Sequence, residues 1–325
     1  MPTTSQLFTV TAEMVDKTVA AGLRHFLPGT SWSQARALID GRRVRFNGEL
    51  WLDEVRRLKI GDQIEILSHG VKAKSLVDQI VLRHVDEHLV VVEKPAGIST
   101  VRHPSERDWL ENRRLKVPTL DDLVLRQLGE ELPTMKHHPR PKLRIVHRLD
   151  KETSGLVVFA RTVPAERGLG VQFKDHTVTR RYYALAVGNV KSQTHKSTLV
   201  RDRGDGRRGS TKSTSLGKTA ITHIETVEKF RGFTLVSCRL ETGRTHQIRI
   251  HLAESGHPVC GEQVYNRPLN GAAHFDASGT PRLFLHATEL GFQHPITGEA
   301  MHWDQPLPPD LVGTIERLRL KTAQE

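Results

Sequence analysis

The stretch RIVHRLDKETSGLVVFAR, residues 144–161, places a dense polar loop between two short apolar runs. The first run ends at Val146, and the second extends from Leu156 to Ala160. Short apolar runs bounded by polar residues and glycine are typical of buried β-strands. The sequence therefore predicts a strand–loop–strand unit that presents Asp150, near the head of the loop, at the end of a sheet.

Asp150 is the first candidate for chemistry. Arg148 and Lys151 flank it, and neighbouring cations favour the ionised form of a carboxylate. A carboxylate that is held charged and partly dry acts as a nucleophile or as a general base. An alternative interpretation is that Asp150 only caps the following turn, which is a common task for aspartate. Both interpretations stay open at this point, and Glu152 is a rival carboxylate.

The second candidate lies in ETGRTHQIRIHLAESGHP, residues 241–258. We expect a helix over residues 245–254, in which Arg249 stands between two isoleucines. A buried arginine needs an anionic partner, because an unpaired buried charge is very costly. Asp150 is one possible partner. The alternative is that Arg249 lies on the surface and pairs with Glu254.

A metal site is not expected, although His246, His251, His257 and Cys260 lie close together in the sequence. Their spacing contains no CxxC pair, no HxxxH pair and no HExxH helix. We therefore interpret the histidines as structural. The chain also has no GxGxxG after a strand and no GxxxxGK[ST], so no nucleotide cofactor is expected. The two cysteines, Cys238 and Cys260, are predicted to be buried and reduced.

The third candidate is Tyr182 in TRRYYALAVG, residues 179–188. Tyr182 and Tyr183 are neighbours on a predicted strand, so their rings point to opposite faces of the sheet. One ring can face the core while the other stacks on a nucleobase in a site. The alternative is that both are ordinary strand aromatics.

Residues 8–67 form a separate small module of two helices and a hairpin. Helical spacing connects Val15, Val19, Leu23 and Leu27, residues 33–39 form a second helix, and Asn47-Gly48 signals a hairpin turn. Four arginines gather around the second helix and its exit, where they can follow a phosphate backbone: Arg36, Arg42, Arg43 and Arg45. The alternative is a solvated helix face. A polar linker, residues 68–78, leads to a main domain at residues 79–320.

Composition sets the class of the protein. The chain has 325 residues and a formal net charge of +11, which favours polyanionic partners, nucleic acid first. The sequence has neither a signal peptide nor a membrane span, so we expect a cytoplasmic protein, acting as a monomer. Runs of strands with interspersed helices, without regular βαβ spacing, predict an α+β fold with a mixed, mostly antiparallel sheet. The Gly-rich basic segment at residues 201–214 is predicted to be a mobile loop.

Five motifs, in order, resemble those of the RluA-type pseudouridine synthases: EHLVVVEKPAGI, HRLDKETSGL, RRYYALAVG, TGRTHQIRIHLAESGHPVCGE and LHATELGFQHPITGE. The resemblance covers residues 80–311. The preceding module, with SQARALIDGRRVRFNG and LKIGDQIEIL, resembles the alpha-L RNA-binding module of a ribosomal small-subunit protein. Two departures stand out: Arg180 replaces the family's lysine before the tyrosine, and residues 102–118 do not follow the family pattern.

The resemblance implies an isomerase that converts uridine in RNA to pseudouridine without a metal or cofactor. By matching positions, Asp150 is the catalytic carboxylate, Arg249 pairs with it, and Tyr182 stacks near the target base. Arg148 fills the place that the flipped uridine leaves in the RNA. Three basic surfaces serve phosphates: the N-terminal module, KHHPRPKLR at residues 136–144 and the segment at residues 201–218.

The expected substrate is large-subunit ribosomal RNA, because the RNA-binding module favours it over transfer RNA. Two hypotheses from other classes compete with this one. The first is a non-catalytic RNA-binding or ribosome-assembly factor on the same fold. The second is a metal-dependent RNA hydrolase that uses Asp150 and the histidines.

Overall fold

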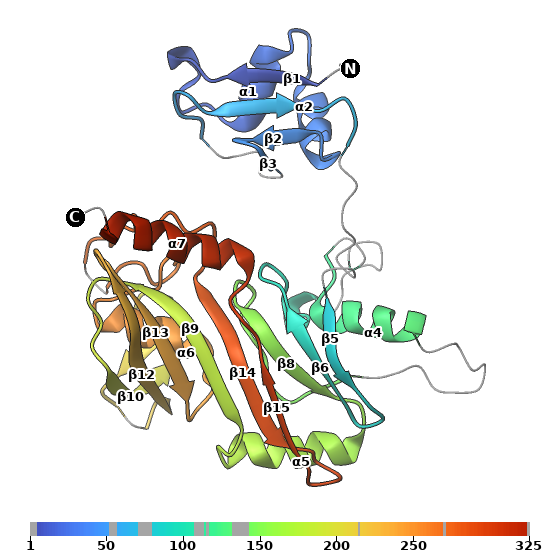
Figure 1. Cartoon of the computed structure of the whole chain (residues 1–325), viewed down its shortest axis with the longest axis vertical. Helices are drawn as coiled ribbons and strands as arrows, with labels where there is room; N and C mark the ends of the chain where they lie inside the picture. Colours follow the sequence, from blue (N-terminus) through green and yellow to red (C-terminus); the bar gives the residue numbers. More distant parts are fainter. Residues whose placement is uncertain are drawn as a thin grey trace. The chain divides into compact units, whose positions relative to one another are not determined.

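The computed structural model describes residues 5–51, 57–70, 80–106, 114, 117–131, 143–213, 215–268 and 271–323. The chain divides into two compact units, Met1–Leu76 and Val77–Glu325, which are drawn in Figure 1. Each unit has a hydrophobic core of its own. Among the described residues, no helix has the length and apolar character needed to cross a bilayer.

The N-terminal unit packs two helices on a small sheet. Its described elements are β1 (Gln6–Thr9), a short 3-10 helix (Ala12–Met14), α1 (Val19–Phe26), α2 (Trp32–Asp40), β2 (Val44–Phe46), β3 (Glu49–Leu50) and β4 (Gln63–Ile66). The described strands form one sheet in the order β1-β4-β2-β3. Ser31 and Gln34 form a capping box that starts α2. The predicted turn at Asn47-Gly48 is confirmed, since both residues have positive φ.

The first predicted helix is shorter than its spacing indicated. The Thr18 side chain caps α1 by accepting a hydrogen bond from the Ala21 N–H, so the helix starts at Val19. Asp16 just before the cap has a φ of 62°, which is incompatible with a helix. The prediction that Val15 belongs to this helix is therefore wrong, and Val15 is exposed. Leu27 is the C-cap residue, and its N–H donates to the Leu23 carbonyl.

The second unit is built on one large sheet. Its described elements are β5 (Val81–Val85), β6 (Leu89–Lys94), a 3-10 helix (Pro104–Glu106), α4 (Leu120–Glu131), β7 (Arg144–Ile145), β8 (Ser154–Ala160), α5 (Val163–Lys174), β9 (Thr179–Val187), β10 (Gln193–Val200), β11 (Gly209–Thr211), β12 (Lys218–Phe230), β13 (Phe233–Leu240), α6 (Gln247–Glu254), β14 (Leu285–Gln293), β15 (Ala300–Asp304) and α7 (Pro309–Ala323).

Within the described residues this sheet follows the order β11-β10-β12-β13-β9-β14-β8-β6-β5, with β15 on β14 and β7 on β8. Its described pairs are antiparallel except β8 with β14, which run parallel where Ser154 lies opposite His286. The predicted α+β fold with a mixed, mostly antiparallel sheet is therefore confirmed. The predicted strand–loop–strand unit is present as β7, the Asp150 loop and β8.

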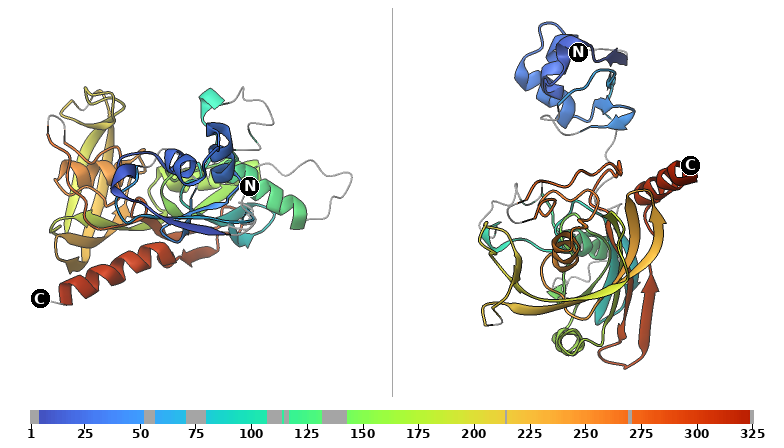
Figure 2. Two further views of the ribbon diagram at one scale, coloured as in Figure 1. Left: turned by 90° about the horizontal axis from the view of Figure 1, so that it is seen from above. Right: turned by 90° about the vertical axis from the view of Figure 1, so that its left-hand side faces the viewer.

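The apolar run after the Asp150 loop is continuous because β8 is buried on both faces. Val157 and Phe159 belong to the larger core, which also contains residues of α4 and α6. Leu156 and Val158 belong to a second core, shared with α5. Figure 2 shows α4 and α6 inside the curve of the sheet and α5 on its outer side. Cys238 and Cys260 are buried and free, as predicted.

Gly155 fixes where the Asp150 loop meets the sheet. Its φ is 119°, and a Cβ at this position would collide with the backbone of Ala287 on β14. Only glycine allows β8 and β14 to approach this closely at the first residues of β8. The loop is thereby held at the end of two central strands, which neighbour each other in the sheet.

The segment at residues 201–214 was predicted to be a mobile loop, but part of it is a β-strand. Residues Gly209–Thr211 form β11, which pairs with β10 from Thr198 to Val200. Before it, the Asp205 carboxylate accepts hydrogen bonds from the side chains of Arg203 and Arg207. The basic loop KHHPRPK at residues 136–142 lies outside the described residues.

Candidate active site

A buried lysine holds the backbone of the Asp150 loop in place. Lys94, at the end of β6, is 1% exposed. Its Nζ donates hydrogen bonds to the carbonyls of Pro95 (2.9 Å), Lys151 (2.9 Å) and Thr153 (2.7 Å). Burial lowers the pKa of Lys94 to about 7. Two of the three acceptors belong to the loop itself, so Lys94 fixes the backbone directly after Asp150.

A hydroxyl group holds the other side of the loop. Thr100 donates to the Leu149 carbonyl at 2.7 Å and accepts from the Leu149 N–H at 3.1 Å. The turn itself is closed through the backbone, with the Thr153 N–H donating to the Asp150 carbonyl at 3.2 Å. The Asp150 side chain therefore faces the cavity, while the rival carboxylate, Glu152, is exposed.

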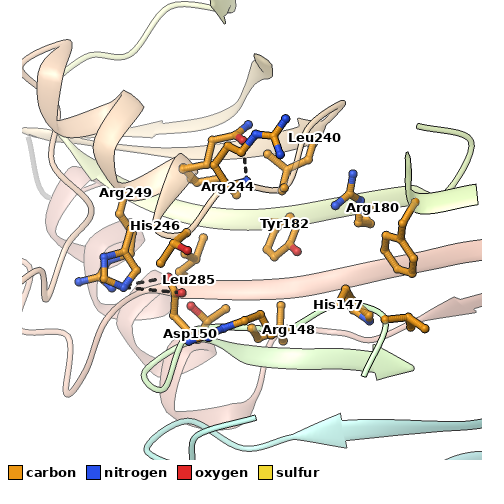
Figure 3. Close-up of a pocket in the computed structure, with 18 of the residues that line it drawn as sticks. His147, Arg148, Asp150, Arg180, Tyr182, Leu240, Arg244, His246, Arg249 and Leu285 are labelled. Carbon is orange, nitrogen blue, oxygen red and sulfur yellow. Dashed lines mark hydrogen bonds and ion pairs between the residues drawn. The ribbon is translucent and has the colours of Figure 1, made fainter. Parts of the chain in front are cut away.

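Asp150 contacts two side chains of the segment that begins α6. Its Oδ2 lies 3.6 Å from Nη1 of Arg249, and its Oδ1 lies 3.7 Å from Nε2 of His246. Figure 3 shows these three side chains gathered at one end of a cavity, with Tyr182 beside them. The cavity has a volume of about 380 Å³, within the range of roughly 300–1,000 Å³ that is typical of small-molecule sites.

Arg249 has a stronger partner that the sequence did not indicate. Its Nε and Nη2 each lie 2.6 Å from the carboxylate of Glu262, whose side chain is 1% exposed. Burial alone would lower the pKa of Arg249, but the bonds to Glu262 and the charge of Asp150 outweigh it and raise this pKa. Glu254, the alternative partner, instead accepts a hydrogen bond from the Ser210 N–H at 2.8 Å.

His246 faces the cavity, although its motif gave no sign of this. It precedes α6 with a φ of 60°, in the left-handed region. Its Nδ1 lies 2.8 Å from the Tyr265 hydroxyl, which directs Nε2 towards Asp150. Burial lowers the pKa of His246, so the ring is neutral at pH 7.

The other two histidines of this segment are structural, as predicted. His251 bonds the hydroxyls of Thr222 and Ser197, each at 2.9 Å, and His257 donates from Nδ1 to the Val187 carbonyl at 2.9 Å. Within the described ranges, no group of three or more His, Cys, Asp or Glu side chains is arranged to hold a metal ion.

Tyr182 lies on β9 between Cys238 of β13 and Ala287 of β14. Its ring lines the cavity and is 7% exposed, whereas the ring of its neighbour Tyr183 does not line the cavity. Burial raises the pKa of the Tyr182 hydroxyl, while the charge of Arg180 works against this rise. The hydroxyl is therefore protonated at pH 7.

The far end of the cavity carries a second buried cation. Arg180 lies with its Cζ 5.4 Å from the ring centre of Phe173, and its Nη2 donates to the Glu241 carbonyl at 3.0 Å. Its Nε is buried and has no hydrogen-bond partner within the described part of the chain. The His147 ring stacks on Phe173 at 4.7 Å, and burial followed by the charge of Arg180 lowers the pKa of His147 to about 3.

The remaining predicted residues occupy different places. Arg148 lines the cavity and is exposed to solvent. In the N-terminal unit, Arg36 is exposed on α2 and Arg42 is half-buried. Arg43 donates from Nε to the Leu67 carbonyl at 2.9 Å, and Arg45 pairs with Glu65 across β2 and β4 at 3.4 Å. These last two arginines therefore also hold the small sheet together.

The fold and the site together define a class of protein, namely enzymes with one carboxylate on a loop at the end of a curved mixed sheet, facing a basic cavity. A profile of RNA pseudouridylate synthases matches residues 88–254. The chain is 40% identical over 228 residues to "Ribosomal large subunit pseudouridine synthase D" of Zymomonas mobilis, covering 70% of this chain and 68% of the relative. It is 35% identical over 294 residues to the protein of the same name from Nitrosomonas europaea, covering 89% and 78%.

Solved structures show the same fold. "Human RNA Pseudouridylate Synthase Domain Containing 4" superposes with a TM-score of 0.56 at 24% identity, covering 73% of this chain and 92% of the human chain. "Human RNA Pseudouridylate Synthase Domain Containing 1" gives a TM-score of 0.53 at 22% identity, covering 78% and 98%. The chain therefore belongs to the RNA pseudouridylate synthase family, and it is an isomerase.

Proposed function

We propose that this enzyme converts uridine to pseudouridine in large-subunit ribosomal RNA. The names of the relatives support the choice of RNA. The observation that carries the proposal is the Asp150 carboxylate, 3.6 Å from Arg249, facing a cavity large enough for a nucleoside. A cytoplasmic enzyme that acts on RNA as a monomer is part of this proposal.

The reaction is an isomerisation and needs no second substrate. The bond from the ribose C1′ to N1 of uracil breaks, the base turns, and a bond from C1′ to C5 forms. The proton on C5 leaves to solvent, and N1 takes up a proton. Asp150 is the carboxylate that acts on the target nucleotide, and Arg249 holds it in place as an anion. Glu262 fixes Arg249 through two bonds of 2.6 Å, so the guanidinium cannot turn away.

Tyr182 and Arg148 act on the base and on the RNA. The Tyr182 ring stacks near the target base, and its hydroxyl, protonated because burial raises its pKa, offers a hydrogen bond. A base within folded RNA must leave its stack to reach the cavity. The exposed guanidinium of Arg148 at the cavity fills the vacated place.

The N-terminal module, residues 8–67, anchors the RNA in this proposal, and residues 68–78 link it to the catalytic domain at residues 79–320. Arg36, which is exposed on α2, and Arg42 are its phosphate contacts in this proposal, and Arg43 and Arg45, which bind the Leu67 carbonyl and Glu65, also hold the module's sheet. The binding energy of such a module is electrostatic and falls with salt concentration.

Tritium release tests the reaction and the substrate together. Ribosomal and transfer RNA transcripts, labelled with tritium at C5 of uridine, are incubated with wild type, Asp150→Ala and the control Glu152→Ala. We expect release from ribosomal RNA with wild type and with Glu152→Ala, and none with Asp150→Ala. Release from transfer RNA alone would contradict the proposal that ribosomal RNA is the substrate. Release by Asp150→Ala would overturn the role of Asp150, and tight binding without release by wild type would favour an assembly factor.

A further inference from the structure

A second cavity, of about 450 Å³, adjoins the catalytic cavity. The two share the turn Gly243-Arg244-Thr245, which connects β13 to α6 and lines both. This turn is well fixed: the Arg244 N–H donates to Oε1 of Gln247 at 3.0 Å, and its Nε donates to the Thr219 carbonyl at 2.9 Å. A ligand that occupies both cavities therefore crosses a rigid shared wall.

The second cavity is lined by four cations, namely Arg201, Arg208, Lys218 and Arg244. Within the described part of the chain, none of the four lies in an ion pair with a carboxylate. Like charges around one hollow repel one another, so the site is poised for an anion that neutralises several of them at once. Burial is the main cause of the lowered pKa of His246, and the charge of Arg208 makes a small contribution in the same direction.

Neighbouring arginines of the same segment behave differently. Arg203 and Arg207 both pair with Asp205, at 3.1 Å and 2.5 Å. These two pairs hold the segment before β11. The protein thus neutralises the arginines that shape the segment and leaves Arg201 and Arg208, on either side of them in the sequence, to line the cavity.

An exposed apolar side chain stands among these cations. Leu216 also lines the second cavity and is 75% exposed. A simple anion gains nothing from such a side chain. A nucleotide does, because its phosphate meets the cations while its sugar and base cover apolar surface.

We propose that the second cavity binds the nucleotide next to the target uridine, with its phosphodiester on Arg201, Arg208, Lys218 and Arg244 and its base against Leu216. This inference rests on the proposed function of the catalytic cavity. The shared turn at Arg244 spans from the cavity for the uridine to the cavity for its neighbour. The pair of cavities therefore reads a short single-stranded segment instead of one isolated nucleoside.

Binding and turnover are measured separately to test this. Arg201→Gln/Lys218→Gln removes two exposed cations of the cavity. Lys229→Gln/Arg239→Gln is the matched control, with two exposed cations on β12 and β13 that line neither cavity. The probe is a fluorescently labelled ribosomal RNA stem-loop that wild type modifies, titrated at several salt concentrations. Tritium release at saturating RNA gives the rate.

The cavity variant should bind on the order of tenfold more weakly at low salt, and the slope of log affinity against log salt should fall by about 1.4, for two contacts to single-stranded RNA. Its rate at saturating RNA and the affinity of the control should stay near wild type. Leu216→Ser should weaken binding without changing the salt slope. Equal affinity and slope in the cavity variant and the control would overturn the proposal.

The same data separate this inference from the proposed function. No tritium release by wild type would contradict the function, whatever the affinities are. Release by wild type together with unchanged binding by the cavity variant contradicts only the second cavity. If the cavity variant binds more weakly but Leu216→Ser has no effect, the proposed base contact is contradicted. The second cavity is then a site for phosphate alone.

Discussion

The catalytic cavity and the second cavity are both rich in cations, but they differ in what neutralises them. In the catalytic cavity Arg249 has two bonds to Glu262 and a contact with Asp150, and Lys94 beneath it has three carbonyls. In the second cavity Arg201 and Lys218 have no carboxylate partner among the described residues. Buried cations with partners inside the protein set the geometry of the catalytic site. Exposed cations without a carboxylate partner are available to bind the phosphates of RNA.

Among substitutions that test this comparison, the largest loss of stability and activity is expected at Arg249. Arg249→Met leaves the Glu262 carboxylate buried without its partner, which costs about 3–5 kcal/mol of unfolding free energy. Chemical denaturation measures this loss, and tritium release should fall below detection. Arg319→Met is the matched control, because Arg319 and Glu228 form a pair of 2.6 Å at the surface. We expect about 0–1 kcal/mol there, and equal losses for the two variants would contradict the account.

Lys94 gives an effect that depends on pH. Its pKa falls from 10.5 in the unfolded chain to about 7 in the folded protein. Between these values the unfolded chain binds the extra proton, so the unfolding free energy of wild type rises with pH, by up to about 1.4 kcal/mol per pH unit. Lys94→Met lacks this group and should lack this rise. Denaturation of both proteins at pH 6 to 9.5 checks the difference.

The absence of this rise would also be informative. If the stabilities of wild type and Lys94→Met changed in parallel from pH 6 to 9.5, the three carbonyl bonds to the ammonium would outweigh burial. Lys94 would then be charged throughout, and the loop that carries Asp150 would be held by an ion–dipole cluster.

The smallest effects are expected at the four arginines of the N-terminal unit. Arg36→Gln/Arg42→Gln should weaken RNA binding severalfold and lower the salt slope by about 1 to 2. Arg45→Gln breaks the pair with Glu65 and should cost less than about 1 kcal/mol of stability. Titration with labelled RNA and thermal denaturation separate these outcomes. A larger binding loss for Arg45→Gln would place the RNA contact on the sheet instead of the helix.

Local features of the fold were predictable from the sequence. The Asn47-Gly48 turn and the buried strand β8 follow from turn chemistry and apolar patterns. The start of α1 was predicted wrongly, because apolar spacing continued to Val15 while the Thr18 cap decided the boundary. Caps act through single hydrogen bonds, which periodicity does not register.

The partners inside the site were harder to predict. The need of Arg249 for an anion was clear, but Glu262 lies after α6 in a stretch without periodicity. Lys94 had a signal that was overlooked, because residues 90, 92 and 94 share one face of a strand and the first two are valines. The contact of His246 with Tyr265 depends on a left-handed backbone at His246, which its sequence does not reveal.

The central claim is that the two cavities have separate tasks, chemistry in one and RNA binding in the other, and one paired measurement tests it most directly. Dissociation constants and single-turnover rates at saturating ribosomal RNA are determined for Asp150→Asn and for Arg201→Gln/Lys218→Gln. The account predicts that Asp150→Asn keeps its affinity and loses its rate, while the double variant keeps its rate and loses affinity. Loss of both quantities in both variants would contradict the separation.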